Sequence, residues 1–326
     1  MELLHDKDAD VTVLNGKTIA VIGYGAQGRA QALCMRDSGV NVIIGLRAGK
    51  SWDSAVQDGF QVMTVAEASA AADVIHILLP DESHGAVFEN EIKPNLSANN
   101  ALCCSHGFAY VFKTIVPPTD VDVIMVAPKG PGTEVRRVFE EGFGCPGLIA
   151  VWQNATGTAR DIALAMAKAE GLTRGGVLEC TMEQETYEDL FGEQNVLCGG
   201  IVDLMKYGFE TLTEAGYPAE MAYFECVHEA KLIVDLIYNG GIERMNGVIS
   251  NTAEFGEYYN GPQILGAEIK EKMKESLKRI ESGEFARVWL AEAAQGAPNL
   301  LAKRKELGEH GVEIVGRKIR SLFERN

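Results

Sequence analysis

Two acidic residues interrupt the apolar face of a helix predicted over Met182–Tyr207. Glu193 lies inside the apolar stripe of that helix, three residues after Leu190 and four before Leu197. Asp189 precedes Glu193 by one turn, on nearly the same face. An uncompensated buried carboxylate costs several kcal/mol, so a carboxylate in such a place must be paired, protonated or bound to a metal.

A second acidic pair, Glu225 and Glu229, repeats this spacing in the helix predicted over Pro218–Tyr238. That helix is apolar almost all round, so it is predicted to be buried. Oxygen ligands without a Cys or His cluster favour a hard cation such as Mg²⁺, and two acidic pairs could bridge two ions about 3.5–4 Å apart. The alternative is that the acids are helix caps or solvated charges. Other acids at the start of the first helix are assigned to surface charge in this way, namely Glu183, Glu185 and Glu188.

A glycine-rich turn near the start of the chain indicates a dinucleotide site. The run Gly23–Gly28 (GYGAQG) follows a predicted strand, Thr18–Ile22, and opens a helical stretch, Arg29–Asp37. Glycines permit the tight turn and the close approach of backbone to a pyrophosphate, and the helix N-terminus offers N–H groups to it. An ordinary glycine-rich turn between a strand and a helix is the alternative.

The loop after the second strand indicates which dinucleotide is bound. An enzyme that uses NAD usually places Asp or Glu there to bind the ribose 2′-hydroxyl. Here Arg47 and Lys50 supply positive charge and Ser51 a hydroxyl, and the only acid nearby is Asp53. This composition suits a 2′-phosphate and therefore predicts NADPH. Solvated loop charges are the alternative.

The elements that position these residues fall into two groups. Short apolar strands separated by helical stretches predict an α/β domain over 1–181, a Rossmann-type doubly wound parallel sheet covered on both faces. Long helical patterns predict an all-α domain over 182–326, with Gly240-Gly241 as a strong helix stop. The predicted strands are Thr18–Ile22, Asn41–Gly45, Gln61–Met63, Val74–Leu79, Ala101–Ser105, Val121–Ala127, Leu148–Val151 and Val177–Cys180.

Composition excludes several classes of protein. A formal charge of −16 argues against nucleic-acid binding. Seven cysteines without a CxxC pair predict reduced thiols and not a disulfide framework or zinc site. An acidic start without an apolar core, and the absence of an apolar run near the ~20 residues that span a bilayer, predict a cytoplasmic protein without membrane association.

Several motifs resemble those of ketol-acid reductoisomerases. The most specific is Asp189–Gly200 (DLFGEQNVLCGG), which resembles the metal-binding signature of that family. Further matching segments cover essentially the whole chain: Ser105–Phe108, Ala127–Gly132, Cys145–Val151, Glu225–Glu229 and Ser250–Ala253. The length fits the short, class I form of the family.

The resemblance implies an activity and a shared site. A 2-aceto-2-hydroxy acid loses its hydroxyl proton, its alkyl group migrates, and NADPH reduces the resulting 2-keto acid to a 2,3-dihydroxy acid, a reaction of branched-chain amino-acid biosynthesis. Asp189 and Glu193 would hold two Mg²⁺ from one subunit. Glu225 and Glu229 would come from the partner subunit, in a homodimer with knotted, intertwined all-α domains that could assemble into a dodecamer.

The resemblance also implies roles for single residues. His106, Lys129 and Glu229 would be catalytic, with Glu229 as the proton shuttle, and Ser250 would bind the substrate carboxylate. The implied cofactor contacts are Tyr24, Gly25, Ala26, Gln27, Arg47, Lys50, Ser51, Asp81, Glu82, Ser83, His84 and Gly132. His84 replaces the Gln usual in the family, which puts that contact in doubt, and Thr133 stands where His is expected and receives no role.

Two other hypotheses stay open on the sequence alone. A dehydrogenase resembling 6-phosphogluconate or 3-hydroxyisobutyrate dehydrogenase also joins a Rossmann domain to a helical domain, but works without metal. An NADPH-binding regulatory protein would bind the cofactor without consuming it. A reductoisomerase needs a divalent metal for turnover, whereas the dehydrogenase does not. A regulatory protein would show no turnover at all.

Overall fold

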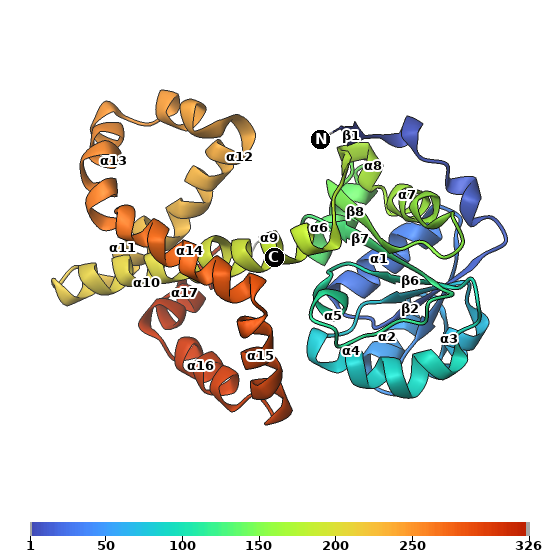
Figure 1. Cartoon of the computed structure of the whole chain (residues 1–326). Coiled ribbons are helices and arrows are strands. Elements are labelled where there is room, and N and C mark those ends of the chain that lie inside the picture. The colour runs from blue at the N-terminus through green and yellow to red at the C-terminus, as the bar shows by residue number, and fades with distance from the viewer. Residues whose placement is uncertain (1, 324–326) are drawn as a thin grey trace. The chain divides into compact units, whose positions relative to one another are not determined.

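The computed structural model describes residues 2–323, in two compact units that divide between Glu188 and Asp189 (Figure 1). Unit 1 is the part up to Glu188, and unit 2 begins at Asp189. The N-terminal part is α/β and the C-terminal part is all-α, as predicted. Within the described residues, no helix is both long enough and apolar enough to cross a membrane.

Unit 1 is built on a single mixed sheet with the strand order β1-β9-β8-β7-β6-β5-β2-β3-β4. Strands β2, β5, β6 and β7 occupy its centre, and their side chains are almost all buried because helices cover both faces. The strands are β1 Leu3–Leu4, β2 Thr18–Ile22, β3 Asn41–Gly45, β4 Gln61–Met63, β5 Val74–Ile77, β6 Ala101–Cys104, β7 Asp122–Pro128, β8 Gly147–Gln153 and β9 Val177–Glu179.

Two apolar clusters fill the space on either side of this sheet. Alternate strand residues contribute to opposite clusters: Ile19 and Val21 pack with α1 and α7, whereas Ala20 and Ile22 pack with α3 and the segment around Phe88. The helices of this unit are α1 Ala26–Asp37, α2 Lys50–Gln57, α3 Val65–Ala71, α4 Asp81–Val87, α5 Phe108–Val111, α6 Gly132–Glu140, α7 Ala159–Ala169 and α8 Leu172–Gly175, with short turns η1 Asp6–Asp8, η2 Val11–Leu14, η3 Phe88–Ile92 and η4 Lys93–Asn95.

The prediction of a wholly parallel sheet is wrong at two pairs. Strand β8 runs antiparallel to β7, with Gly147 opposite Pro128, and β1 runs antiparallel to β9. Because β8 begins beside the end of β7, the connection through α6 leaves and returns at the same edge of the sheet. Antiparallel strands added to an otherwise parallel sheet are common.

Unit 2 consists of helices in the described residues. Helix α9, Met182–Gly192, leads into it from unit 1. The predicted helix stop at Gly240-Gly241 is confirmed, because Gly241 adopts a non-helical conformation, with φ 79° and ψ 175°, and so divides α12 (Glu229–Val248) into two helical segments that meet at a kink. The remaining segments are η5 Glu193–Leu197, α10 Gly199–Glu214, α11 Ala219–Tyr223, η6 Phe224–His228, α12 Glu229–Val248, α13 Asn251–Ile264, α14 Ala267–Glu281, α15 Glu284–Ala294, α16 Pro298–Gly308 and α17 Gly311–Ser321.

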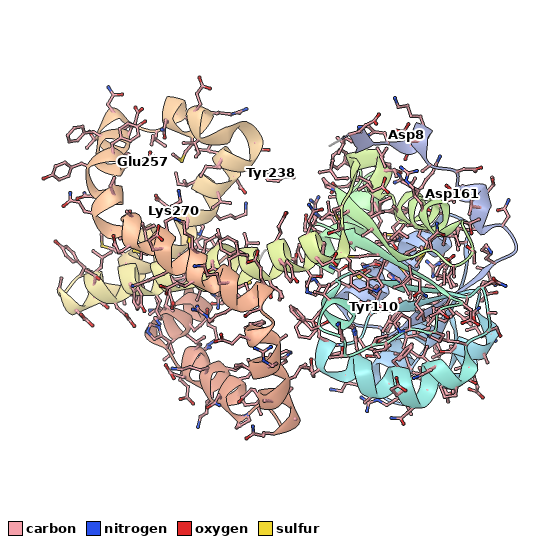
Figure 2. The ribbon with its side chains drawn as sticks, in the orientation of Figure 1. Asp8, Tyr110, Asp161, Tyr238, Glu257 and Lys270 are labelled. Carbon is pink, nitrogen blue, oxygen red and sulfur yellow. The ribbon has the colours of Figure 1, made fainter. Side chains whose placement is uncertain are left out.

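Unit 2 leaves much apolar surface exposed. One cluster of buried residues in this unit is formed by Phe209, Ala222, Tyr223 and Ile319, with a few half-buried neighbours. The prediction that the helix over Pro218–Tyr238 is buried holds within one chain for Ala222 and Tyr223 but is wrong for the part on α12, where Tyr238 is 84% exposed. Tyr110, by contrast, lies inside unit 1 (Figure 2). Other exposed apolar residues on α12 are Leu232, Ile233, Val234, Ile237, Ile242 and Val248.

Candidate functional site

The carboxyl ends of the central strands carry most of the predicted site residues of unit 1. The glycine-rich turn follows β2, the Asp81 segment follows β5, His106 follows β6, and Lys129 follows β7. Because β2, β5, β6 and β7 are mutually parallel neighbours, these four strand ends meet at one edge of the sheet. That edge is where open α/β sheets bind their ligands.

The glycine-rich turn needs glycine at specific positions. Gly23 adopts φ +105°, and a Cβ there would lie 2.4 Å from the carbonyl oxygen of Leu78. A Cβ on Gly28 would lie 2.3 Å from the carbonyl oxygen of Gly23. Helix α1 therefore begins tightly against the strand, and no side chain caps its first N–H groups. These N–H groups form the kind of helix N-terminus that binds a pyrophosphate.

A glycine at the start of α6 allows that helix to approach the same turn. A Cβ on Gly132, at the start of α6, would lie 2.2 Å from the carbonyl oxygen of Ala26. The side chain of Gln27 also donates a 2.9 Å hydrogen bond to the carbonyl oxygen of Gly130. The residues predicted for the pyrophosphate side of the site therefore lie together.

The loop predicted to bind the 2′-phosphate is exposed. Arg47, Lys50 and Ser51 lie between β3 and the first turn of α2, and all three are exposed. The far end of α2 is tied to the glycine-rich turn, because Asp58 accepts a 2.8 Å hydrogen bond from the Tyr24 hydroxyl. Burial and the hydrogen bond to Asp58 raise the pKa of Tyr24, so its hydroxyl stays a donor.

Glu185 is the centre of a charged cluster in unit 1. Its carboxylate accepts hydrogen bonds from Lys129 Nζ at 2.8 Å, His106 Nδ1 at 3.1 Å and the Gly107 amide at 3.3 Å. Only 2% of Glu185 is exposed. Burial alone would raise the pKa of Glu185, but the hydrogen bond and charge of His106, together with Lys129, hold that pKa below its usual value. Glu185 is therefore a buried carboxylate that orients two predicted catalytic groups.

The assignment of Glu185 to surface charge was wrong. Helix α9 lies against the loop after β6 so closely that a Cβ on Gly107 would lie 2.3 Å from Thr186 Oγ1 and 2.4 Å from Met182 Cγ. The sequence carried a usable signal, since Glu185, Asp189 and Glu193 recur at every fourth position and so share one helix face. The apolar residues next to Glu185 in the sequence do not reveal that this side chain is buried, because the groups that bury it are distant in the sequence.

The contact with Glu185 constrains the chemistry of His106. A carboxylate only accepts hydrogen bonds, so Nδ1 of His106 carries a proton, and Nε2 is the nitrogen whose protonation can change. The ammonium group of Lys129 places a positive charge at the same carboxylate. The side chains of His106 and Lys129 remain 21% and 33% exposed, so both can meet a ligand at the sheet edge.

The residue that departs from the family pattern, His84, is buried. Its Nε2 lies 2.8 Å from the carbonyl oxygen of Leu79, and a carbonyl requires a donor, so Nε2 carries a proton there. Burial lowers the pKa of His84, and burial raises the pKa of the neighbouring Asp81. His84 thus holds the turn between β5 and α4, so its ring is engaged with the backbone.

Each pair of predicted metal ligands has one member in a π-helical turn of unit 2 and the other on an adjoining α-helix. Glu193 opens η5, one turn after Asp189 at the end of α9. Glu225 lies in η6, and Glu229 is the first residue after it. Single π-turns are rare and often mark functional sites, because they re-aim side chains within a helix. The prediction that these faces are buried is wrong within one chain, since Glu193, Glu225 and Glu229 are exposed and Asp189 is half-buried.

Ser250, predicted to bind the substrate carboxylate, caps helix α13. Its hydroxyl oxygen accepts a 3.1 Å hydrogen bond from the Ala253 amide. The hydroxyl hydrogen is not used by that bond and can donate to another group.

Family models match both parts of the chain. Residues 13–176 match the model of the acetohydroxy acid isomeroreductase NADPH-binding domain, and residues 182–325 match that of the ketol-acid reductoisomerase C-terminal domain. Other solved structures, such as an oxidoreductase from Jannaschia sp. CCS1 at 16% identity and a TM-score of 0.61, share the fold alone.

Close relatives extend this match over the full length. The chain is 84% identical over 326 residues, all of both chains, to the ketol-acid reductoisomerase (NADP(+)) of Akkermansia muciniphila. It is 63% identical over 329 residues, 99% of each chain, to the ketol-acid reductoisomerase (NAD(+)) of the uncultured archaeon GZfos26G2. A solved structure of an NADH-preferring ketol-acid reductoisomerase from an uncultured archaeon matches with a TM-score of 0.97 and 62% identity, over 100% of each chain. The chain therefore belongs to the ketol-acid reductoisomerase family.

Proposed function

We propose that this protein converts 2-acetolactate to 2,3-dihydroxy-isovalerate, and 2-aceto-2-hydroxybutyrate to 2,3-dihydroxy-3-methylvalerate, with Mg²⁺ and NADPH, in valine and isoleucine biosynthesis. The observation that carries the proposal is the series of three carboxylates at every fourth position, two on α9 and the third at the first residue of η5. The first, Glu185, holds His106 and Lys129. The next two, Asp189 and Glu193, are the proposed metal ligands.

The donor set fits Mg²⁺. Asp189 and Glu193 offer only carboxylate oxygens, as do Glu225 and Glu229, and hard divalent cations prefer oxygen ligands. The π-turns at both pairs supply local geometry that an unbroken helix lacks. When bound, two such ions supply Lewis-acid polarisation of the ketone and stabilise the alkoxide from which the alkyl group migrates.

Four side chains of the protein would bind the substrate or move its protons. Glu229 accepts the proton of the substrate hydroxyl, and Ser250 donates a hydrogen bond to the substrate carboxylate. Lys129, a positive group fixed by Glu185, stabilises negative charge on the substrate oxygens. His106, oriented through Nδ1, presents Nε2 for positioning a proton or a water.

The preferred cofactor is NADPH. Arg47 and Lys50 are exposed cations beside Ser51, and an acid that would repel a 2′-phosphate is not found until Asp53. Relatives carry either an NADP or an NAD designation, so family membership leaves the preference open. The ratio of kcat/KM for NADPH to that for NADH measures it directly. A ratio below one would contradict this assignment.

The working form is a homodimer in the cytoplasm, and it could assemble further into a dodecamer. Support comes from the large apolar side chains of α12 that are exposed in a single chain, because apolar side chains gathered on a surface are typical of a protein–protein interface. A second subunit would also bring Glu225 and Glu229 to the Asp189 and Glu193 of the first.

Mixing two inactive variants tests the shared site. E193Q and E229Q each remove a proposed ligand from a different half of the site. In a mixed dimer, one site receives both substitutions and the other receives neither. Activity should therefore return when the two variants are unfolded and refolded together. Failure to regain activity, with mixed dimers present by mass, would contradict the shared arrangement.

Product identification tests the reaction. Incubation with 2-acetolactate, NADPH and Mg²⁺ should yield 2,3-dihydroxy-isovalerate, identified by chromatography and mass spectrometry. Cofactor binding without product would favour a regulatory protein. Full activity after chelation of the divalent metal would favour a metal-free dehydrogenase.

A further inference from the structure

Gln31 joins several elements beneath the sheet edge. This side chain of α1 is fully buried. Its amide nitrogen donates to Gln27 Oε1 and Ser105 Oγ, both at 3.0 Å, and its Oε1 lies 2.6 Å from His76 Nε2. Gln27 continues the chain of hydrogen bonds to the Gly130 carbonyl. One carboxamide thus links the glycine-rich turn with β5 and with the segments that follow β6 and β7.

The direction of these hydrogen bonds is fixed by chemistry. The oxygen of Gln31 accepts, so His76 Nε2 must carry a proton. Burial lowers the pKa of His76 to about 4, so the ring is neutral near neutral pH and Nδ1 carries no proton. Ser105 Oγ lies 3.1 Å from the same Gln31 oxygen and can donate to it. The carboxamide therefore has a defined orientation, with both its oxygen and its nitrogen engaged.

Gln31 and Glu185 bind different residues of the segment around His106. Ser105 directly precedes His106, and Gly107 directly follows it. Gln31 binds the residue before His106, whereas Glu185 binds His106 itself and the residue after it. The segment after β6 is thus held by one side chain of α1 and one of α9.

We infer that Gln31 is a positioning residue, which fixes the Ser105-His106 segment relative to the dinucleotide turn so that His106 meets the substrate in a productive geometry. This inference rests on the proposed function for the role of His106. It goes further by assigning that role to a buried amide that touches neither the substrate nor the cofactor. Small misplacements of catalytic groups are costly, because catalysis depends on pre-set geometry.

The test replaces Gln31 with Met, which has similar volume but makes no comparable hydrogen bonds. The Q31M variant should lose roughly tenfold in kcat with acetolactate, while its KM for acetolactate stays within about twofold, since hydrogen bonds near 1 kcal/mol each are removed. S69A is the matched control, because buried Ser69 donates a hydrogen bond to the Val65 carbonyl within its own helix, α3. S69A should keep wild-type kcat.

A double-mutant cycle separates positioning from general stability. If Gln31 acts through Ser105, then S105A should lower kcat, and the double variant Q31M/S105A should be no slower than the slower single variant. Multiplying effects, or a normal kcat in S105A, would overturn the inference. Should Q31M fail to fold, S105A still decides the matter by its kcat.

Hydrogen exchange makes the inference independent of the proposed reaction. Amides of residues 105–108 should exchange faster in Q31M than in wild type, while those of β2 stay protected, and S69A should leave residues 105–108 unchanged. If wild type turns over no acetolactate, the proposed function fails, and the exchange data still decide whether Gln31 holds the segment. Unchanged exchange at residues 105–108 in Q31M would overturn the inference.

Discussion

Replacing Glu185 with Gln tests how the charged cluster positions His106 and Lys129. The carboxylate offers two acceptor oxygens to three donors. Gln keeps nearly the same shape but offers only one acceptor oxygen, and its NH₂ group must face either His106 Nδ1 or Lys129 Nζ. At least one donor then loses its partner, and the Lys129 ammonium loses its counter-charge.

The size of the effect follows from these contacts. A hydrogen bond to a charged group contributes about 1.5–3 kcal/mol, and breaking a buried ion pair on one side costs about 3–5 kcal/mol. Because Lys129 is one-third exposed, solvent offsets part of that loss. We therefore expect E185Q to raise the activation barrier by about 2–4 kcal/mol, a loss of roughly 30–1,000-fold in kcat/KM.

The assay is NADPH oxidation with acetolactate and Mg²⁺. The matched control is E188Q, which removes an exposed acid one turn from Glu185 on α9. E188Q should keep at least about half of the wild-type rate, since exposed charges contribute little. If E185Q kept the same rate as E188Q, the cluster would have no part in catalysis and this reasoning would be refuted.

Three further predictions concern the metal, the cofactor and the core. E193Q should lower turnover by more than roughly 100-fold, since substitution of a group that only supports a metal ligand already costs roughly 10–100-fold. The affinity for NADPH, measured by fluorescence, should stay the same. Normal turnover would contradict the assignment of Glu193 as a metal ligand. R47D should weaken NADPH binding by roughly tenfold or more and NADH binding far less, and equal losses in a titration would count against 2′-phosphate recognition. Burial raises the pKa of Glu170 well above its ordinary value, so the folded protein retains a proton that the unfolded chain releases, and stability falls as the pH rises. E170Q should therefore raise the melting temperature more at about pH 8 than at about pH 5, and the same increase at both would exclude titration of Glu170 as the cause.

The α/β unit could be predicted closely because its signals are local. Three strands, Thr18–Ile22, Asn41–Gly45 and Gln61–Met63, have the predicted bounds, and the others differ by only one or two residues at an end. Continuous apolar runs between helices suffice for this. The direction of β8 was missed, because an apolar run reads the same in either direction and its direction depends on pairing with β7.

The site could be predicted only in part. The glycine-rich turn was placed correctly between β2 and α1, because its glycines serve contacts with nearby backbone, such as that of Gly28 with Gly23. Glu185 was missed, since what distinguishes it from Glu188 is the position of His106 and Lys129, which are far away in the sequence.

Burial of the helical unit could not be judged from periodicity. The apolar pattern of α12 is real, but Leu232 and Ile237 face solvent in a single chain. A hydrophobic pattern indicates that a face is covered, and it does not say whether the same chain or another one covers it. The physical argument that Glu225 and Glu229 are buried carboxylates therefore applies to the proposed dimer.

The most direct test of the central proposal is the metal dependence of turnover. NADPH oxidation with acetolactate should be rapid with Mg²⁺, should stop when EDTA removes the metal, and should resume when Mg²⁺ is restored. Oxidation at an unchanged rate in metal-free buffer would contradict the assignment of Asp189, Glu193, Glu225 and Glu229 as ligands of catalytic ions.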